Sequence, residues 1–191
     1  MNKRYITADQ LLRDSFDLAL RVVESGYRPT FLIALWRGGT PIGIAIQEVL
    51  DICGIDVNHI AVRTSSYTGI DQRDREVKVH GLSYAEECLQ QHDRLLIVDD
   101  VHDSGRSVEA LIKEIKERCG ERSPHDIKLA TVYYKPGRSE VARVPDFYMH
   151  ETDQWLVFPH ELFGLEQEEL LEQKPGLEQL HHRLLAQLKR G

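Results

Sequence analysis

The sequence predicts an α/β fold in which a parallel-rich central sheet is flanked by helices. Two observations lead to this prediction. Short runs of almost continuous apolar residues alternate along the chain with longer segments in which apolar residues recur every three or four positions. Strands and helices that alternate in this order usually build parallel sheets covered by helices. The length of 191 residues suits one domain with a small appendage.

The apolar runs are predicted to be strands. The runs at 31–36 and 94–98 carry apolar residues at nearly every position, which is typical of strands buried on both faces of a sheet. Strands are expected at residues 31–36, 57–64, 94–98 and 128–134, with short extended segments at 147–149 and 155–158.

The helical segments begin and end at recognisable residues. Thr7-Ala8-Asp9-Gln10 has the pattern of a capping box, and Gly26 ends the helix that it opens. Pro41 suits the first turn of a second helix over 42–50. A third helix is expected over 107–119, where apolar residues recur at helical spacing.

Two segments differ from this alternation. Residues 65–79 are polar, charged and poorly periodic, and are expected to form a long mobile loop with edge strands at best. Residues 165–191 are helical in pattern, with an apolar stripe after Pro175-Gly176. We therefore expect one domain over residues 1–164 and a helical C-terminal extension over 165–191.

Composition argues against several classes of function. The net charge of −7 disfavours sequence-independent binding of nucleic acid, which needs a basic face. Three scattered cysteines form no metal-ligand spacing and are expected to be reduced thiols. No apolar run follows Lys3 and Arg4 or reaches membrane-spanning length. A soluble, cytoplasmic protein without nucleic-acid or membrane partners is expected.

The most informative stretch covers residues 95–107. An apolar run ends on Asp99 and Asp100, and Asp103-Ser104-Gly105 and Ser107 follow before the helical pattern begins. Carboxylates can accept hydrogen bonds from ribose hydroxyls, and free N–H groups at a helix start bind phosphate. Gly105 allows close approach of the backbone to a ligand. The pattern indicates a ligand with hydroxyls and a phosphate, although acids at such a turn can also simply cap the helix.

This stretch resembles the phosphoribosyl pyrophosphate (PRPP) motif of type I phosphoribosyltransferases. The resemblance implies the fold of that family, with a small hood, and the use of PRPP as substrate. It implies that Asp99 and Asp100 hold the ribose hydroxyls, directly or through Mg²⁺, and that Asp103 is the general base. The 5′-phosphate would be held by Ser104, Gly105, Arg106 and Ser107.

Two further segments resemble loops of the 6-oxopurine branch of this family, which salvages hypoxanthine, guanine and xanthine. Arg37-Gly38-Gly39 is similar to the pyrophosphate loop, in which Arg37 and Gly38 would hold the leaving group and a non-proline cis peptide is common. Ser65-Ser66-Tyr67 is similar to the start of the flexible catalytic loop, in which Arg73 or Arg75 would reach pyrophosphate. An ordinary strand-to-helix turn and a solvated hairpin are the structural alternatives for these segments.

A third similarity concerns the base. In the 6-oxopurine branch, Lys135 would donate to the exocyclic oxygen of the purine, Trp155 would stack on the base, and the backbone carbonyl of Leu156 would face the purine 2-position. Glu161 would contact magnesium or pyrophosphate. A lone lysine is more often a solvated surface charge, and a lone tryptophan is more often part of a core.

The sequence leaves other functions open. The chain could transfer to another base, such as a pyrimidine, or could be a regulatory protein that binds PRPP or a nucleotide without turnover. Lys135 and Trp155 favour a purine, and Asp103 favours an enzyme. His102 occupies a position that is commonly apolar or acidic in the family, and is expected to face solvent. The resemblance further implies small-molecule substrates, Mg²⁺ as cofactor, and a homodimer or homotetramer.

Overall fold

The computed structural model describes residues 3–68, 75–174, 180, 183 and 186, which fall into two compact units. The larger one, the sheet unit, is Leu12–Asp153, and the smaller one, the terminal unit, combines Met1–Leu11 with Gln154–Gly191. The boundary expected after residue 164 lies inside the terminal unit, because the first strand of the chain pairs with its last strand.

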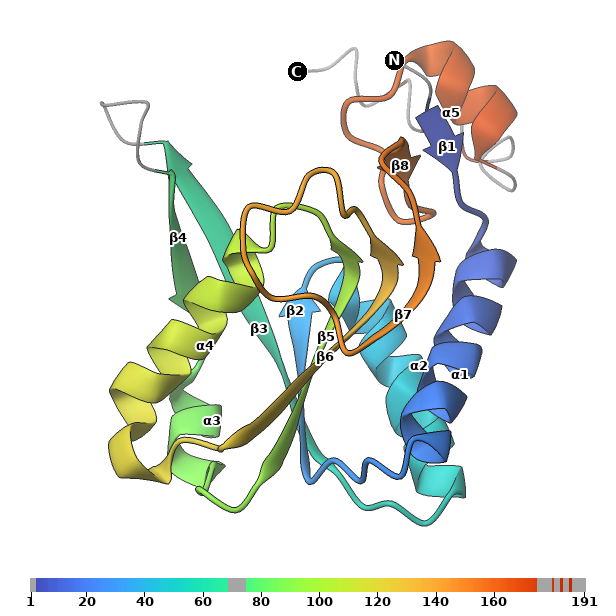
Figure 1. The fold of residues 1–191 in the computed structure, drawn as a ribbon. Helices are drawn as coiled ribbons and strands as arrows, with labels where there is room; N and C mark the ends of the chain where they lie inside the picture. Colours follow the sequence, from blue (N-terminus) through green and yellow to red (C-terminus); the bar gives the residue numbers. More distant parts are fainter. Residues whose placement is uncertain (1–2, 69–74, 175–179, 181–182, 184–185, 187–191) are drawn as a thin grey trace. The chain divides into compact units, whose positions relative to one another are not determined.

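The sheet unit is built on a six-stranded sheet with the order β4-β3-β2-β5-β6-β7 (Figure 1). All neighbouring strands pair in parallel except β3 and β4, which form an antiparallel pair at one edge. The predicted parallel-rich sheet is therefore confirmed. The strands are β2 (Phe31–Trp36), β3 (Asn58–Thr68), β4 (Arg75–His80), β5 (Arg94–His102), β6 (Asp126–Tyr134) and β7 (Phe147–Glu151).

Helices cover both faces of this sheet. α1 (Ala8–Glu24) and α2 (Gly39–Ile52) lie on one face, while α3 (Ser83–Cys88) and α4 (Arg106–Cys119) lie on the other (Figure 1). One of the two hydrogen bonds of the predicted capping box is seen at the start of α1, where Thr7 Oγ1 accepts the Gln10 N–H at 3.1 Å. None of the helices in the described part of the chain combines the length and apolar character needed to cross a membrane.

The apolar runs form the core because both faces of the central strands are covered. Every residue of β5 from Leu95 to Val98 is fully buried. The apolar stripe of α4 packs in one cluster with side chains of β2 and β5, so helical spacing correctly identified its buried face. The members of this cluster on β2, β5 and α4 are Phe31, Ile33, Leu35, Leu95, Ile97, Val108, Leu111, Ile112, Ile115 and Cys119.

The strands are longer than the sequence predicts. β5 continues past Val98 because Asp99, Val101 and His102 still pair with β6. β3 runs to Thr68 and pairs with β4, so both ends of the segment 65–79 are strands, as the expectation of edge strands at best allowed, and the loop is shorter than expected. Strand pairing there outweighs the polar composition. Residues 69–74 and most of the apolar stripe of the tail lie outside the described residues.

The short elements were not predicted, because they are too short to show periodicity. They are α3, the 3₁₀ turn Gly120–Arg122 and β1 (Lys3–Tyr5), which pairs in parallel with β8 (Trp155–Val157) in the terminal unit. In the same unit, Glu169 of α5 (Gln167–Gln173) accepts hydrogen bonds from Lys3 Nζ at 2.6 Å and Tyr5 Oη at 2.5 Å. These two donors join β1 to α5 and lower the pKa of Glu169 to about 2.

The Glu169 cluster makes the terminal unit sensitive to acid. A carboxyl group whose pKa is lower in the folded state stabilises that state above the unfolded pKa, and this stabilisation is lost as the pH falls toward the folded pKa. Glu169→Gln should therefore lower the melting temperature at pH 7, and the difference from the parent should shrink between about pH 4.5 and 2. Glu172→Gln, at an exposed position of the same helix, is the control. A melting-temperature difference that stays constant over this range would contradict the role of the carboxylate.

Candidate active site

The pyrophosphate-loop segment lies directly against the acid pair. β2 and β5 are parallel neighbours in which Ala34 is opposite Val98, so the chain leaves both strands at the same edge. A Cβ on Gly38 would lie 1.8 Å from Asp100 Oδ2, and a Cβ on Gly39 would lie 2.4 Å from the Val98 carbonyl oxygen. Only glycine permits this approach at either position. The Trp36–Arg37 peptide is cis, as the resemblance implies.

The acid pair is suited to a cation or to hydroxyl donors. Asp99 Oδ1 accepts the Asp100 N–H at 3.0 Å, and Asp100 is nine-tenths buried. Burial, together with the neighbouring Asp100 charge, raises the pKa of Asp99 well above its ordinary value. A bound cation favours the ionised form of both carboxylates and so offsets this rise of the pKa. The pair thus fits Mg²⁺, which proteins commonly bind through one or two carboxylates together with substrate phosphates. Within the described residues no group of three or more His, Cys, Asp or Glu side chains forms a complete metal site.

The loop after β5 leads into the start of α4 and presents groups that are suited to an anion. Gly105 precedes the helix with a φ of +78°, and the left-handed conformation explains the glycine. A cavity of about 240 Å³ opens beside it, and its polar lining includes two serines and two arginines. Backbone N–H groups at the start of a helix and arginine side chains both favour phosphate. The residues that line this cavity are Val77, Asp103, Ser104, Arg106, Ser107, Arg138 and Glu140.

Asp103 is held between two cations. Lys135 Nζ donates to Asp103 Oδ2 at 2.9 Å, and Arg138 Nε forms an ion pair with Asp103 Oδ1 at 3.0 Å. The Lys135 side chain is only 5% exposed, whereas that of Asp103 is 37% exposed, so the lysine reaches the carboxylate from inside the protein. Sequence reasoning missed Arg138, since an arginine in a Pro-Gly turn carries no signal of its own.

His102 lies under the loop and not in solvent, so the expectation of a solvent-facing ring is wrong. Its side chain is buried, and Nε2 lies 3.2 Å from the Arg143 carbonyl oxygen. A Cβ on Gly105 would lie 2.9 Å from the ring, which places the imidazole directly beneath the turn. Burial lowers the pKa of His102. A neutral ring that packs beneath Gly105 supports the loop mechanically.

The remaining predicted residues are distributed over both units. Trp155 and Leu156 are adjacent in β8, with Trp155 48% exposed and Leu156 buried, and both belong to the terminal unit. Glu161 is in the same unit, and its carboxylate accepts the Phe158 N–H at 3.0 Å. Ser65-Ser66-Tyr67 lies in β3 rather than in a loop, and Arg73 lies outside the described residues.

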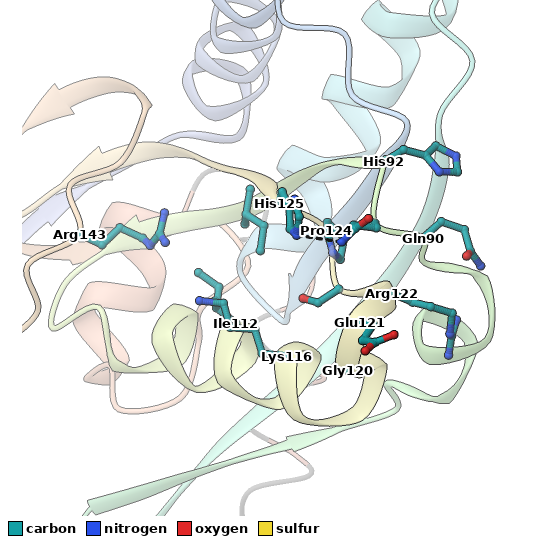
Figure 2. Close-up of a pocket in the computed structure, with 13 residues that line it drawn as sticks. Gln90, His92, Ile112, Lys116, Gly120, Glu121, Arg122, Pro124, His125 and Arg143 are labelled. Carbon is teal, nitrogen blue, oxygen red and sulfur yellow. Dashed lines mark hydrogen bonds between the residues drawn. The ribbon is translucent and has the colours of Figure 1, made fainter.

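A second cavity, of about 920 Å³, is found at the opposite ends of the strands (Figure 2). Gln90 and His92 precede β5 and His125 precedes β6, so this cavity lies at the amino ends of the strands. Arg122 donates to the carbonyl oxygens of Leu89 and Glu86. None of the residues predicted for the site lines this cavity.

The family follows from a match over most of the chain. A family model described as "Phosphoribosyl transferase domain" matches residues 3–163 of this chain. The chain belongs to the phosphoribosyltransferase family. A search among curated protein sequences gave no match. The match to the family confirms the resemblance that residues 95–107 suggested, and the α/β architecture is the one expected for a phosphoribosyltransferase.

Several solved structures resemble this phosphoribosyltransferase. A purine phosphoribosyltransferase from Pyrococcus horikoshii is 28% identical, with 87% of this chain and 98% of that chain covered and a TM-score of 0.66. A protein from Neisseria gonorrhoeae with bound ppGpp is 21% identical, with 96% and 95% covered and a TM-score of 0.67. The xanthine-guanine-hypoxanthine phosphoribosyltransferase of Helicobacter pylori is 20% identical, with 82% and 92% covered and a TM-score of 0.64. At 21% and 20% identity, the last two similarities show only that the fold is shared.

The close approach of Gly38 to Asp100 predicts that a side chain at position 38 impairs phosphoribosyl transfer. Gly38→Ala would place a Cβ 1.8 Å from the Asp100 carboxylate and push the two segments apart. Because small misplacements at a reacting centre are costly, turnover should fall by about 10²-fold or more, measured as nucleotide formation from PRPP. Gly54→Ala is the control for backbone strain without a clash, since the φ of Gly54 is +73° but a Cβ there meets nothing within 4 Å. Turnover of Gly38→Ala within a few-fold of the parent would show that the close approach is not required.

Proposed function

We propose that this protein transfers the phosphoribosyl group of PRPP to a 6-oxopurine, namely hypoxanthine, guanine or xanthine, in a magnesium-dependent reaction that releases pyrophosphate. The observation that carries the proposal is the contact between the buried Lys135 and Asp103 beside the anion-binding cavity. This contact places a hydrogen-bond donor and a proton acceptor together at one edge of the sheet, next to a phosphate site.

Asp103 is the proposed general base. The anomeric carbon of PRPP loses pyrophosphate with oxocarbenium-like character, while a nitrogen of the purine attacks that carbon. Asp103 would accept a proton from the imidazole part of the purine, and its negative charge would stabilise the cationic sugar. Lys135 and Arg138 orient its two oxygens, and a fixed orientation lowers the entropy cost of reaching the transition state.

The other residues bind the two ends of PRPP. Ser104, Gly105, Arg106 and Ser107 would hold the 5′-phosphate at the start of α4. Arg37 and the backbone of Gly38 would hold pyrophosphate. Asp99 and Asp100 would bind the ribose hydroxyls and Mg²⁺, with Glu161 as a further contact to the metal. When bound, Mg²⁺ would neutralise part of the charge on the leaving pyrophosphate.

The choice of a 6-oxopurine rests on Lys135 and on the relatives. An ammonium group has donors and no acceptor, so Lys135 matches the 6-oxo group and opposes the amino group of adenine. Trp155 would stack on the base, and the Leu156 carbonyl would face its 2-position. Among the similar structures, one is a purine enzyme and one is named for xanthine, guanine and hypoxanthine. The homodimer or homotetramer that the resemblance implies stays a prediction.

Replacement of Asp103 separates catalysis from binding. Asp103→Asn keeps the shape and one oxygen acceptor but cannot take up a proton. Turnover should fall by about 10²–10⁴-fold, which is the usual contribution of a positioned general base, while PRPP affinity from calorimetry should change far less. Asp56→Asn, at an exposed position before β3, is the control. If turnover remains within a few-fold of the parent, Asp103 has a structural role only.

The base panel tests the proposed substrate class. With PRPP and Mg²⁺, hypoxanthine, guanine or xanthine should give nucleotide and adenine should not, because a site built around one hydrogen bond strongly rejects a mismatched analogue. Lys135→Ala should reduce the ratio of 6-oxopurine to adenine turnover. Trp155→Ala should weaken all accepted purines together by ~1–3 kcal/mol.

Three outcomes of this panel would contradict the proposal. Efficient use of adenine or of orotate by the parent would exclude a 6-oxopurine preference while leaving the PRPP site intact. Full turnover in excess chelator would exclude the magnesium requirement. Nucleotide binding without pyrophosphate release from any base would indicate a regulatory binding protein.

A further inference from the structure

The loop between β6 and β7 covers the phosphate-binding turn. In this segment, residues 135–146 and here called the β6–β7 loop, the Glu140 N–H donates to the Ser104 carbonyl oxygen at 3.0 Å. A Cβ on Gly105 would lie 2.3 Å from Val141 Cγ2, so the loop packs directly on the turn. Arg143 Nε donates to Glu109 of α4 at 3.0 Å. The β6–β7 loop is therefore a wall of the cavity at the start of α4.

Glu140 pairs with one of the two arginines that line this cavity. Its carboxylate forms an ion pair with the Arg106 guanidinium, and both residues line the cavity. The other carboxylate in the lining, Asp103, already forms ion pairs with Lys135 and Arg138. Glu140 is thus the lining acid that pairs with the arginine next to the serines of the loop.

A phosphate in this cavity would compete with the Glu140 carboxylate for the Arg106 guanidinium. Arginine binds carboxylates and phosphates through the same donors, so the two anions exclude one another at Arg106. The Arg106 and Glu140 side chains are 43% and 50% exposed, and ion pairs with this degree of exposure are weak. A phosphate monoester carries up to two charges and three acceptor oxygens and can displace such a carboxylate, whereas a monovalent anion competes poorly.

We propose that the Glu140 carboxylate is an internal occupant of the phosphate site: it pairs with Arg106 until a phosphate monoester displaces it. Because weaker anions cannot displace it, Glu140 makes the site selective for phosphate monoesters. This inference rests on the proposed function for the identity of the site. On displacement, the ion pair between Arg106 and Glu140 is exchanged for one between Arg106 and phosphate. The bond from the Glu140 N–H to Ser104 involves only backbone atoms and can keep the β6–β7 loop in place.

The test compares the binding of ribose 5-phosphate by calorimetry in the parent, Glu140→Gln and Glu117→Gln. Glutamine keeps the size of the side chain and removes the competing charge. Glu140→Gln should bind ribose 5-phosphate on the order of three- to tenfold more tightly, because both competition and repulsion are removed. Glu117→Gln removes the same charge from an exposed position elsewhere on α4 and should leave the affinity unchanged.

Two further measurements make the result specific. In an Arg106→Ala background, Glu140→Gln should give a clearly smaller gain in affinity, since the contested cation is absent and only the repulsion between Glu140 and the phosphate is left to remove. Chloride should inhibit ribose 5-phosphate binding more strongly in Glu140→Gln than in the parent. Unchanged or weaker binding by Glu140→Gln, or the same gain in the Arg106→Ala background, would overturn the proposal and indicate that Glu140 only anchors the loop. Tighter binding without nucleotide formation from any purine would refute the proposed reaction and leave the role of Glu140 intact.

Discussion

The parallel pairing of β2, β5 and β6 is the constraint on which the site depends. These strands are buried on both faces, and their register places Ala34 opposite Val98 and Val98 opposite Ala130. Their carboxyl ends therefore reach one edge of the sheet together. The three loops that follow are polar and rich in glycine, and packing of their own side chains does not determine where they lie. The buried strands bring them together, as in other parallel sheets whose ligands bind at this edge.

Two opposite electrostatic environments meet at this edge. On β5, burial opposes the ionisation of Asp99 beside Asp100, and such a pair is suited to hydroxyl donors and to a cation. A few residues later, Lys135, Arg138 and Arg106 surround the loop that starts at Asp103, and such a cluster is suited to an anion. A substrate that carries hydroxyls, a phosphate and a metal-bound pyrophosphate matches both environments at once. The arrangement explains why two acids and three cations coexist within one short stretch of strand ends.

The β6–β7 loop is the least predictable part of the site and the most informative. It supplies the lysine and arginine that orient Asp103, the carbonyl oxygen that faces His102, and the acid that pairs with Arg106. Apart from the buried Lys135 and the packing of Val141 on Gly105, its contacts include backbone hydrogen bonds and partly exposed ion pairs, each of which contributes little. Several weak contacts hold the loop against the turn, and any one of them can be exchanged for a ligand.

Much of the sheet unit could be predicted from the sequence because its signals are local. Consecutive apolar residues locate β2, the start of β5 and β6, helical spacing locates the buried face of α4, and the acids and glycine between them locate the PRPP loop. The extension of β5 and the hairpin of β3 with β4 could not be predicted. Their polar residues become strand only because a partner strand is adjacent.

The sequence by itself determined the fold class and the PRPP motif, and it singled out Asp103 and Lys135 as site residues for the proposed reaction. Only the tertiary structure decided that His102 is buried, that Arg138 and Glu140 line the phosphate cavity, and that the two ends of the chain form one unit through β1 and β8. The physical reason is the range of each interaction. Strand and helix patterns depend on neighbours in the sequence, whereas burial and ion pairing depend on groups that only folding brings within contact.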